Sequence, residues 1–506
     1  MSVFENYLEK VGEVGHVHSI NNGIVYCTGL AGARINEKII FEHDQIGFVY
    51  TIGREYTELL LLDSGGVDLG TVAVRTNETM TVSVSESLLG CVVDPFGNPI
   101  DRVKTKAVEG RSLEAKAPPL IDRVRINQNL ETGVTLIDLL LPIGKGQRQL
   151  ILGDQKTGKT SFLIQTMARQ VQLGNVCIYA CIGKKKSDLA SIIDKLTRMK
   201  VIQNIIVVAA PASIPTSLIY LAPFTAMSIA EYFRDKGDDV LVVMDEISAH
   251  ARYYRELTIS SKKMPGRDGY PGDIFYLHSH LMERAGRFLI GESTREKETL
   301  TLKIEGKTAS ITCLPVVETL GGDLTGYIQT NLMSMTDGHL FFDVSQFQEG
   351  LRPAVNIGLS VTRIGKQTQK TVERDIALKI RKILFDYSKA RDVAKFGVEL
   401  LQETRQRVIM GEKVLAVFDQ LGDTIVPRVI QLLFTELLMD GFWENADLVQ
   451  IKKDKETILS LLEDGRIVKI SKQLKQALEL GSAKKFSDTV IGAMADLEQI
   501  CSAKNS

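Results

Sequence analysis

The sequence is poor in the features that mark membrane-spanning, disulfide-stabilised or nucleic-acid-binding proteins. No run of about 18 or more apolar residues occurs, so we expect no helix that spans a bilayer. The six cysteines are scattered, without the spacing of a disulfide framework or a zinc site, which predicts reduced and mostly buried thiols. Lys and Arg number 61 against 62 Asp and Glu, so no excess of basic residues would attract nucleic acid.

What the chain does contain is the composition of a globular protein, with 44% hydrophobic and 24% charged residues over 506 positions. At about 150 residues per domain, this length predicts about three domains. The seven histidines do not predict a metal site. His278 and His280 are spaced to share one face of a strand, but no third ligand is evident beside them.

Hydrophobic patterning divides the chain into three predicted domains. Residues 1–76 carry short runs rich in Val, Ile, Thr and Tyr, broken by Gly and Asn, which predict a small antiparallel β-barrel. In residues 77–369, continuous apolar runs such as 176–180 and 240–244 alternate with helix-type segments. This pattern predicts an α/β domain with a mainly parallel sheet that is covered by helices on both faces. Residues 370–506 are rich in Leu, Lys, Glu and Ala at helical spacing, and predict a C-terminal α-helical domain.

One segment matches the phosphate-binding pattern G-x-x-x-x-G-K-[ST]. Its residues are Gly153, Asp154, Gln155, Lys156, Thr157, Gly158, Lys159 and Thr160. An apolar run precedes it and a helix-like segment follows at 161–172, which is the context that the pattern requires. Glycines let backbone N–H groups converge on phosphate oxygens, and the helix N-terminus adds partial positive charge. We expect Lys159 to reach the β- and γ-phosphates of ATP, and the Thr160 hydroxyl to ligate Mg²⁺.

The second part of such a site is a carboxylate at the end of a neighbouring strand. The apolar run at 240–244 ends directly before Asp245, so we expect Asp245 to hold Mg²⁺ through water. Taken alone, Asp245 is equally consistent with a residue that caps the next helix. The phosphate loop earlier in the chain favours the magnesium role.

ATP hydrolysis also requires an acid that activates the attacking water, and the sequence lacks one at the expected place. In ring ATPases of the RecA-like kind, this acid lies just past the strand that follows the phosphate-loop helix. Here that strand runs into Lys184, Lys185 and Lys186, which are otherwise an ordinary solvated basic turn. A lysine does not act as a base near neutral pH unless it is strongly desolvated. Glu246, which follows Asp245, is the alternative base, and the sequence does not fix its direction.

Two further segments are similar to the alpha subunits of F-type ATP synthases. Residues 265–279 read PGRDGYPGDIFYLHS, and residues 352–363 read RPAVNIGLSVTR. Together with the phosphate loop, they make the chain resemble this family of RecA-like P-loop proteins from about residue 10 to at least residue 440. In the catalytic beta subunits of the family, a glutamate stands where this chain has Lys184. In alpha subunits that place is usually glutamine, so Lys184 departs from both.

The resemblance implies a ring of alternating alpha- and beta-type subunits around a rotating gamma-type central stalk. Arg363 would act in trans as an arginine finger on the nucleotide of the neighbouring beta-type subunit, and Ser334 would line the same interface. The chain itself would bind ATP or ADP with Mg²⁺ and would not hydrolyse the nucleotide. Arg352, Pro353 and Gln420 would lie with the phosphate loop in this nucleotide site.

The resemblance also implies a location and further partners. The protein would be peripheral on the cytoplasmic face of the bacterial plasma membrane, or on the equivalent side of an organelle, and would act indirectly on a membrane sector that moves protons or sodium ions. A peripheral stalk is a further expected partner, although only about ten residues precede the barrel, fewer than in the family's stalk-docking segment. The family's second adenine-side glutamine falls on Gly422, and its Arg-Gln pair in the loop becomes Gln155 and Lys156.

Three alternative functions are weighed against this one. A protein-export or flagellar ATPase hydrolyses ATP at its own loop and would need the glutamate that Lys184 replaces. An RNA-translocating hexamer resembling Rho would need an N-terminal platform of aromatic and basic residues, and residues 1–76 contain no tryptophan. A structural ring subunit with an empty loop, as in vacuolar-type ATPases, would not need to retain Lys159, Thr160 and Asp245.

Overall fold

The structure is a computed structural model that describes residues 2–63, 66–101, 109–261, 263–291, 306–395, 402–463 and 468–505. The chain divides into two compact units, each assembled from several stretches of chain. Unit 1 comprises residues 1–125, 146–152 and 171–337, and unit 2 comprises residues 126–145, 153–170 and 338–506. The three-domain boundaries after residues 76 and 369 stay a prediction.

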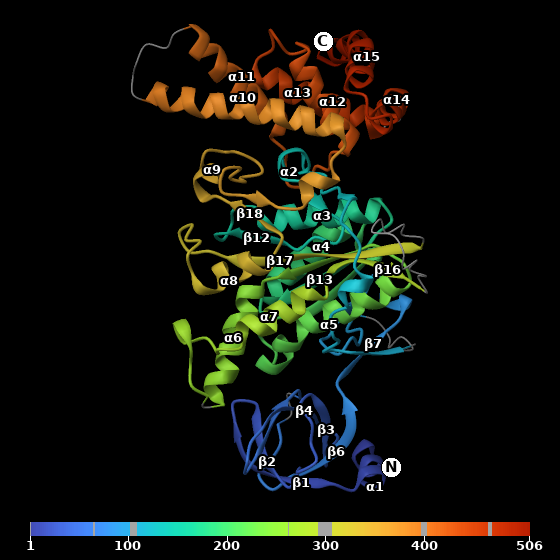
Figure 1. Cartoon of the computed structure of the whole chain (residues 1–506), viewed down its shortest axis with the longest axis vertical. Coiled ribbons are helices and arrows are strands. Elements are labelled where there is room, and N and C mark those ends of the chain that lie inside the picture. Colours follow the sequence, from blue (N-terminus) through green and yellow to red (C-terminus); the bar gives the residue numbers. More distant parts are fainter. Residues whose placement is uncertain are drawn as a thin grey trace. The chain divides into compact units, whose positions relative to one another are not determined.

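A closed antiparallel barrel forms the N-terminal part of unit 1 (Figure 1, blue). Its strands follow the order β1-β2-β5-β4-β3-β6 and are β1 (Val14–Asn21), β2 (Ile24–Thr28), β3 (Glu37–Phe41), β4 (Ile46–Ile52), β5 (Thr57–Leu61) and β6 (Val72–Thr79). The buried side chains of Val25, Phe41 and Leu59 belong to its apolar core. Helix α1 (Val3–Val11) precedes the barrel and begins with reciprocal hydrogen bonds between Ser2 and Glu5. The predicted barrel is confirmed.

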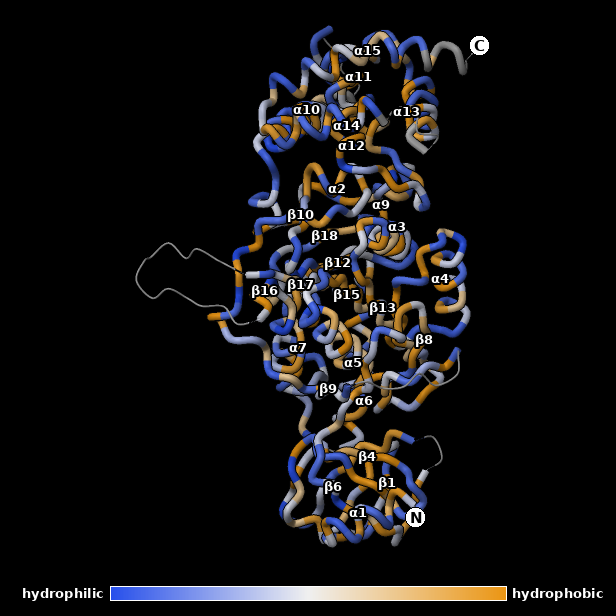
Figure 2. The backbone as a smooth tube through the Cα atoms, turned by 90° about the vertical axis from the view of Figure 1, so that its right-hand side faces the viewer, coloured by the Kyte–Doolittle hydropathy of each residue, from blue (hydrophilic) through white to orange (hydrophobic). Residues whose placement is uncertain are grey.

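The main sheet of unit 1 is mostly parallel, as predicted. Its strands follow the order β12-β17-β15-β13-β14-β8 and are β8 (Val92–Val93), β12 (Gln149–Gly153), β13 (Val176–Ile182), β14 (Ile205–Ala210), β15 (Val240–Asp245) and β17 (Lys307–Glu318). Every residue of β13, β14 and β15 is buried. Figure 2 labels β13 and β15 among the strands of this sheet. Burial on both faces explains why these strands read as continuous apolar runs.

Helices and short strands complete unit 1. The helices are α4 (Lys186–Arg198), α5 (Thr216–Asp235), α6 (Ile247–Ser260), α7 (Ile274–Glu283) and α8 (Tyr327–Met335). Strand β16 (Gly286–Ile290) pairs antiparallel with β17, and β7 (Thr81–Val84) pairs antiparallel with β9 (Glu109–Ser112). Helix α5 packs against β13 and β15, and α6 packs against β17.

Unit 2 is mainly helical and contains the predicted C-terminal helical domain (Figure 1, orange to red). Its C-terminal helices are α10 (Thr371–Lys395), α11 (Gln402–Phe418), α12 (Arg428–Met439), α13 (Leu448–Glu463), α14 (Val468–Glu479) and α15 (Ala483–Asn505). Its earlier elements are β10 (Asn129–Leu130), α2 (Thr135–Leu140), β11 (Ile143–Gly144), α3 (Lys159–Gln172), β18 (Gly338–Phe342), α9 (Val344–Gln348) and β19 (Val361–Thr362). Trp443, the one tryptophan of the sequence, is buried in this unit.

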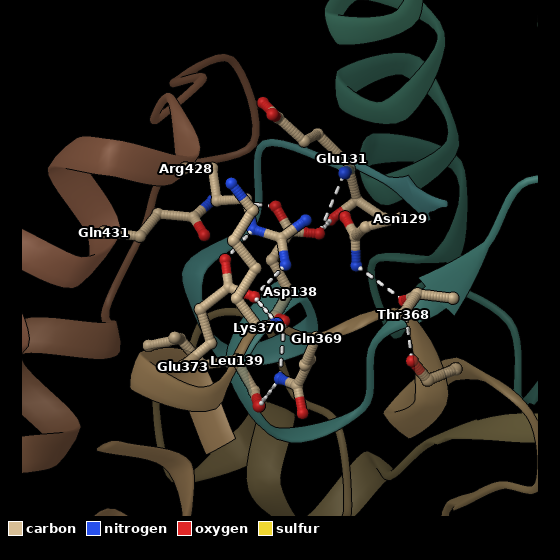
Figure 3. Close-up of polar contacts among 12 residues, drawn as sticks. Asn129, Glu131, Asp138, Leu139, Thr368, Gln369, Lys370, Glu373, Arg428 and Gln431 are labelled. Carbon is tan, nitrogen blue, oxygen red and sulfur yellow. Dashed lines mark hydrogen bonds and ion pairs between the residues drawn. The ribbon is translucent and has the colours of Figure 1, made fainter. Parts of the chain in front are cut away.

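A buried polar network in unit 2 joins α2 to the first turns of α10 and α12 (Figure 3). Asp138 accepts hydrogen bonds from Thr132 and from the Gln431 amide, both at 2.8 Å. Burial raises the pKa of Asp138 to about 6, although these donors act in the opposite direction. Glu373 pairs with the guanidinium of Arg428, and the Glu373 side chain is 2% exposed.

One sequence expectation is wrong. His278 and His280 lie in helix α7 and not in a strand, so their spacing does not place them on one strand face. His278 instead faces His250 of α6, with 3.1 Å between His278 Nε2 and His250 Nδ1. Within the described residues, no helix combines the length and hydropathy needed to cross a membrane. The same ranges hold no group of three or more His, Cys, Asp or Glu side chains that could bind a metal ion.

Candidate functional site

The phosphate loop leads from β12 into helix α3, in the strand–loop–helix arrangement predicted from the sequence. Gly153 has a φ of 150°, and a Cβ at this position would lie 2.5 Å from the carbonyl oxygen of Phe342. Gly158 has a φ of 98°. Both positions therefore require glycine, one because of a close backbone approach and both because of their backbone conformation. Lys156, between them, also has a positive φ, of 61°.

The loop curls around the side chain of Lys159. The Lys159 ammonium donates to the carbonyl oxygens of Gly153 and Asp154 at 2.5 and 2.6 Å, and the Thr157 hydroxyl donates to the Asp154 carbonyl oxygen at 2.7 Å. Helix α3 begins at Lys159, so the backbone N–H groups of its first turn lie at the loop. A cation, a helix N-terminus and a glycine-rich loop in one place form an anion-binding arrangement that suits a nucleotide phosphate.

The segment around Gln420 lies against the phosphate-loop helix in unit 2. Gln165 of α3 donates to the carbonyl oxygens of Leu421 and Thr424 at 2.7 and 2.8 Å. Gly422 approaches Ser161 so closely that a Cβ on Gly422 would lie 3.0 Å from the Ser161 Cβ. The glycine that replaces the family's second glutamine thus sits directly beside the start of α3.

Both the oxygen and the nitrogen of the Gln420 side-chain amide form hydrogen bonds within unit 2. Its Oε1 accepts from the Thr135 backbone N–H and hydroxyl at 3.1 and 3.2 Å. Its Nε2 donates to the carbonyl oxygens of Gly133 and Thr424 at 2.6 and 2.7 Å. These four contacts match the two donors and two lone pairs of an amide. The Gln420 amide is therefore fully hydrogen-bonded within unit 2, and its predicted contact with the nucleotide stays a prediction.

Arg352 and Pro353 line a cavity of about 800 Å³ in unit 2. The Arg352 guanidinium lies over the Phe347 ring, 3.6 Å from its centroid, and donates to the Phe347 and Leu351 carbonyl oxygens at 2.9 and 2.7 Å. The Gln420 backbone N–H donates to the Arg352 carbonyl oxygen at 2.8 Å. The structure thus joins the Arg352 and Gln420 segments by this bond, and the expected role of Arg352, Pro353 and Gln420 in the nucleotide site stays a prediction.

Asp245 ends strand β15 in unit 1, and both of its carboxylate oxygens have partners. The Lys184 ammonium lies 3.0 Å from Oδ1, and the Tyr179 hydroxyl donates to Oδ2 at 2.7 Å. Burial lowers the pKa of Lys184, but the adjacent Asp245 carboxylate outweighs it, and the net shift is upward. Lys184 is therefore a cation held on Asp245 and not a base. Lys185 and Lys186 are exposed, as an ordinary basic turn would be.

Glu246, the alternative base, is also engaged in unit 1. Its Oε1 accepts from the Ser248 hydroxyl at 3.0 Å and from the Arg252 guanidinium at 2.9 Å. Both contacts fall on Oε1 and come from α6, so they orient the Glu246 carboxylate toward that helix. The structure thus gives Glu246 a salt bridge with Arg252 of α6.

The two predicted interface residues lie on separate units. Ser334 is an exposed residue of α8 in unit 1, and its hydroxyl donates to the Asn331 carbonyl oxygen at 2.6 Å. Arg363 is exposed in unit 2, directly after β19. Burial lowers the pKa of His339, and the positive charge of Arg363 adds to the shift.

Sequence reasoning missed two contributors to the site. It did not predict that Lys184 turns inward onto Asp245, or that Tyr179 holds the other oxygen. A signal was available, because Cys181 pairs with Asp245 in the β13–β15 register. Residues near Cys181 on β13 therefore end up beside Asp245 once these two strands are taken as neighbours.

The chain is similar to known nucleotide-binding proteins. Residues 133–362 match the model of the ATP synthase alpha/beta family, nucleotide-binding domain. The chain is 36% identical to ATP synthase subunit alpha of Ruthia magnifica subsp. Calyptogena magnifica, over 92% of this chain and 90% of that protein. It is 37% identical to the protein of that name from Acholeplasma laidlawii, over 92% and 91%. For the one from Carsonella ruddii, the identity is 34%, over 91% and 94%.

Proposed function

Since the chain belongs to the family of ATP synthase alpha subunits, we propose that it is the nucleotide-binding, non-hydrolysing subunit of a rotary ATP synthase. The family's functions are ATP synthesis, nucleotide binding and ion transport. In this proposal the chain holds ATP or ADP at the loop from Gly153 to Thr160. It supplies Arg363 in trans to the nucleotide of a neighbouring beta-type subunit, with Ser334 at the same interface.

The observation that carries the non-hydrolysing role is the pairing of Lys184 with Asp245. In the sequence, Lys184 stands where a hydrolysing subunit needs a carboxylate that orients water, and its ammonium forms a salt bridge of 3.0 Å with Asp245. The neighbouring acid, Glu246, is bound to Arg252. With a lysine in place of the water-orienting acid and Glu246 held by Arg252, we expect ATP bound at this loop to persist. This argues against the protein-export or flagellar alternative, which must hydrolyse ATP at its own loop.

The proposed partners follow from the family. They are beta-type subunits in an alternating ring, a gamma-type central stalk, a peripheral stalk and, indirectly, a membrane sector that moves protons or sodium ions. The chain would be peripheral on the cytoplasmic face of a bacterial plasma membrane or on the equivalent side of an organelle. Exposed Arg363 and Ser334 are consistent with roles at an interface between subunits.

The predicted magnesium site is supported at only one of its two residues. Thr160 lies in the first turn of α3, where its hydroxyl suits a ligand to a phosphate-bound cation. Asp245 does not fit a magnesium ion, because a lysine ammonium and a tyrosine hydroxyl already hold its two oxygens. Magnesium at Thr160 and Asp245 together therefore stays a prediction.

Nucleotide binding by the loop is tested with Lys159→Ala. Removing the ammonium that pairs with the phosphates should weaken ATP binding by about 2 kcal/mol, or roughly thirtyfold in Kd. Isothermal titration calorimetry on the full chain measures the change. Lys472→Ala is the control, since Lys472 is an exposed lysine of α14 and lies outside the phosphate loop. Equal ATP affinity in the Lys159 variant and the wild type would contradict the proposed binding site.

A further inference from the structure

Three sulfur atoms lie together in the interior of unit 1. The Cys313 thiol of β17 lies 4.0 Å from the thioether sulfur of Met244 on β15 and 3.9 Å from that of Met282 on α7. Cys313 pairs with Val242 in the parallel β15–β17 register, and Met244 follows Val242 by two residues, on the same face of the sheet. All three sulfur-bearing side chains are 0% exposed. Two strands and a helix thus hold one thiol and two thioethers together, away from solvent.

The separations of these sulfur atoms suit a bound metal ion. Thiolate and thioether sulfurs are the ligands that soft ions such as Cu(I) prefer. An ion bonded to two sulfurs at about 2.3 Å, the zinc–thiolate distance, makes an angle of about 120° with sulfurs that lie 3.9 or 4.0 Å apart. This is the angle of a planar three-coordinate site. Both thioethers therefore already lie at the distance from the Cys313 sulfur that such an ion requires.

The charge of the three ligands selects the charge of the ion. A thiolate carries one negative charge and a thioether carries none, so a monovalent ion gives a neutral cluster. A divalent ion would leave a net positive charge in a buried site, which is costly without a further anionic partner. In the part of the chain that the structure describes, no group of three or more His, Cys, Asp or Glu side chains offers a divalent ion a better site.

We propose that Cys313, Met244 and Met282 form a binding site for one soft monovalent metal ion of the Cu(I) or Ag(I) class. The ion bonds to the three sulfurs, and the Cys313 proton leaves to solvent as the metal–thiolate bond forms. No electron is transferred, because the ion keeps its single positive charge. Since the site is buried, the ion enters during folding or during a local opening of unit 1. The inference is independent of the proposed ATP site, whose phosphate loop belongs to unit 2.

The test uses Ag(I) as the probe, because it is stable in air where Cu(I) is not. The full chain is incubated with Ag(I) and excess free methionine, a competing thioether, until loading stops changing, and native mass spectrometry counts the bound ions. The wild type should hold one silver ion more than Cys313→Ala. Cys177→Ala, which removes a buried thiol of β13, is the matched control and should load silver like the wild type. Equal numbers of silver ions in the wild type and Cys313→Ala would overturn the inference.

The two methionines are tested separately. Met244→Leu and Met282→Leu each remove one sulfur and nearly conserve side-chain volume, so both variants should fold. Each should weaken the binding of this ion by about tenfold or more, measured by competition with free methionine. Met227→Leu, at a buried methionine of α5, is the control and should bind silver like the wild type. Unchanged affinity in both variants would overturn the three-sulfur site and show only a packing contact, and this result stands even if Cys313→Ala fails to fold.

Discussion

At the scale of single residues, the imidazoles of His250 and His278 form a buried pair in unit 1. His250 Nε2 lies 3.0 Å from the Tyr220 carbonyl oxygen, so this nitrogen carries the proton and Nδ1 accepts from His278 Nε2. Burial lowers the pKa of His250 to about 4, although the Tyr220 carbonyl acts in the opposite direction. Burial also lowers the pKa of His278, and the charge of His250 adds to this shift. Both rings are therefore neutral at pH 7.

This pair predicts a loss of stability in mild acid. The folded-state pKa of His250 lies below the unfolded value of about 6.5, so its contribution is complete above pH 6.5 and falls as the pH drops toward 4. The free energy of unfolding should fall by about 2 kcal/mol from this group between pH 7 and pH 5. Hydrogen exchange of unit 1 at the two pH values measures the loss.

His250→Gln tests whether this histidine causes the loss of stability, since the glutamine amide offers a donor and an acceptor and does not titrate. His250→Gln should reduce the pH dependence of exchange protection between pH 7 and pH 5. His280→Gln is the control, because His280 lies on α7, the helix of His278, and is less buried than either histidine of the pair. An unchanged pH dependence in His250→Gln would contradict the assignment.

The conformation of the phosphate loop was predictable from the sequence, because the pattern specifies both the backbone conformation at the glycines and the chemistry of the lysine. Gly153 and Gly158 adopt the positive φ values that phosphate loops need, and Lys159 lies where the pattern places it. The inward direction of Lys184 was not predictable from a run of three lysines. Only the tertiary pairing of β13 with β15 distinguishes Lys184 from its exposed neighbours.

At the scale of elements, the buried strands of the main sheet were easier to predict than some of the helices. The buried strands β13, β14 and β15 coincide with continuous apolar runs, because burial on both faces leaves no polar positions. The spacing of His278 and His280 suggested one face of a strand, whereas both residues lie in helix α7. Two residues alone do not distinguish the periods of helix and strand. Helix α1 lies before the predicted strands, and the sequence analysis did not assign it although Phe4, Leu8 and Val11 recur at helical spacing.

The ion pair between Glu373 of α10 and Arg428 of α12 predicts that Glu373→Gln strongly lowers the free energy of unfolding of unit 2. Both side chains are largely buried, at 2% and 13% exposure, so Glu373→Gln would leave Arg428 charged and unpaired. Breaking a buried pair in this way costs about 3–5 kcal/mol. The fluorescence of Trp443, the one tryptophan, reports the unfolding of these helices in urea.

The control for Glu373 is a solvent-exposed pair in the same unit. Glu403 and Arg407 of α11 lie 4.0 Å apart with side chains 87% and 57% exposed. Glu403→Gln should therefore change the free energy of unfolding by less than about 1 kcal/mol. Similar urea midpoints for the Glu373 and Glu403 variants would show that the buried pair does not stabilise the contact between α10 and α12.

At the scale of the whole molecule, the proposed role of Arg363 appears only in the assembled ring. Arg363→Ala should lower ATP turnover by the ring about thousandfold, the scale of an arginine finger that stabilises the transferred phosphoryl group. ATP binding by the isolated chain should be nearly unchanged. Arg198→Ala, at a surface pair with Asp194 on α4, is the control. Normal turnover in a ring that carries Arg363→Ala would exclude the finger.

The division of labour between binding and hydrolysis explains several features together. In the proposed function, the loop glycines and Lys159 would hold the phosphates, and Lys184, which is paired with Asp245, would stand in place of the water-orienting acid. This function belongs to an assembly, so no single-chain pattern could predict its partners beyond the family relationship.

The most direct test of this account is ATP turnover by the purified chain with and without a beta-type subunit. We predict that the chain alone binds ATP stoichiometrically and releases no phosphate above background, and that turnover appears when the beta-type subunit is added. Phosphate release by the chain alone at about 1 per second or faster, in the range of ordinary enzymes, would contradict the account. Such a rate would require a water-activating acid at the loop, and the account assigns none.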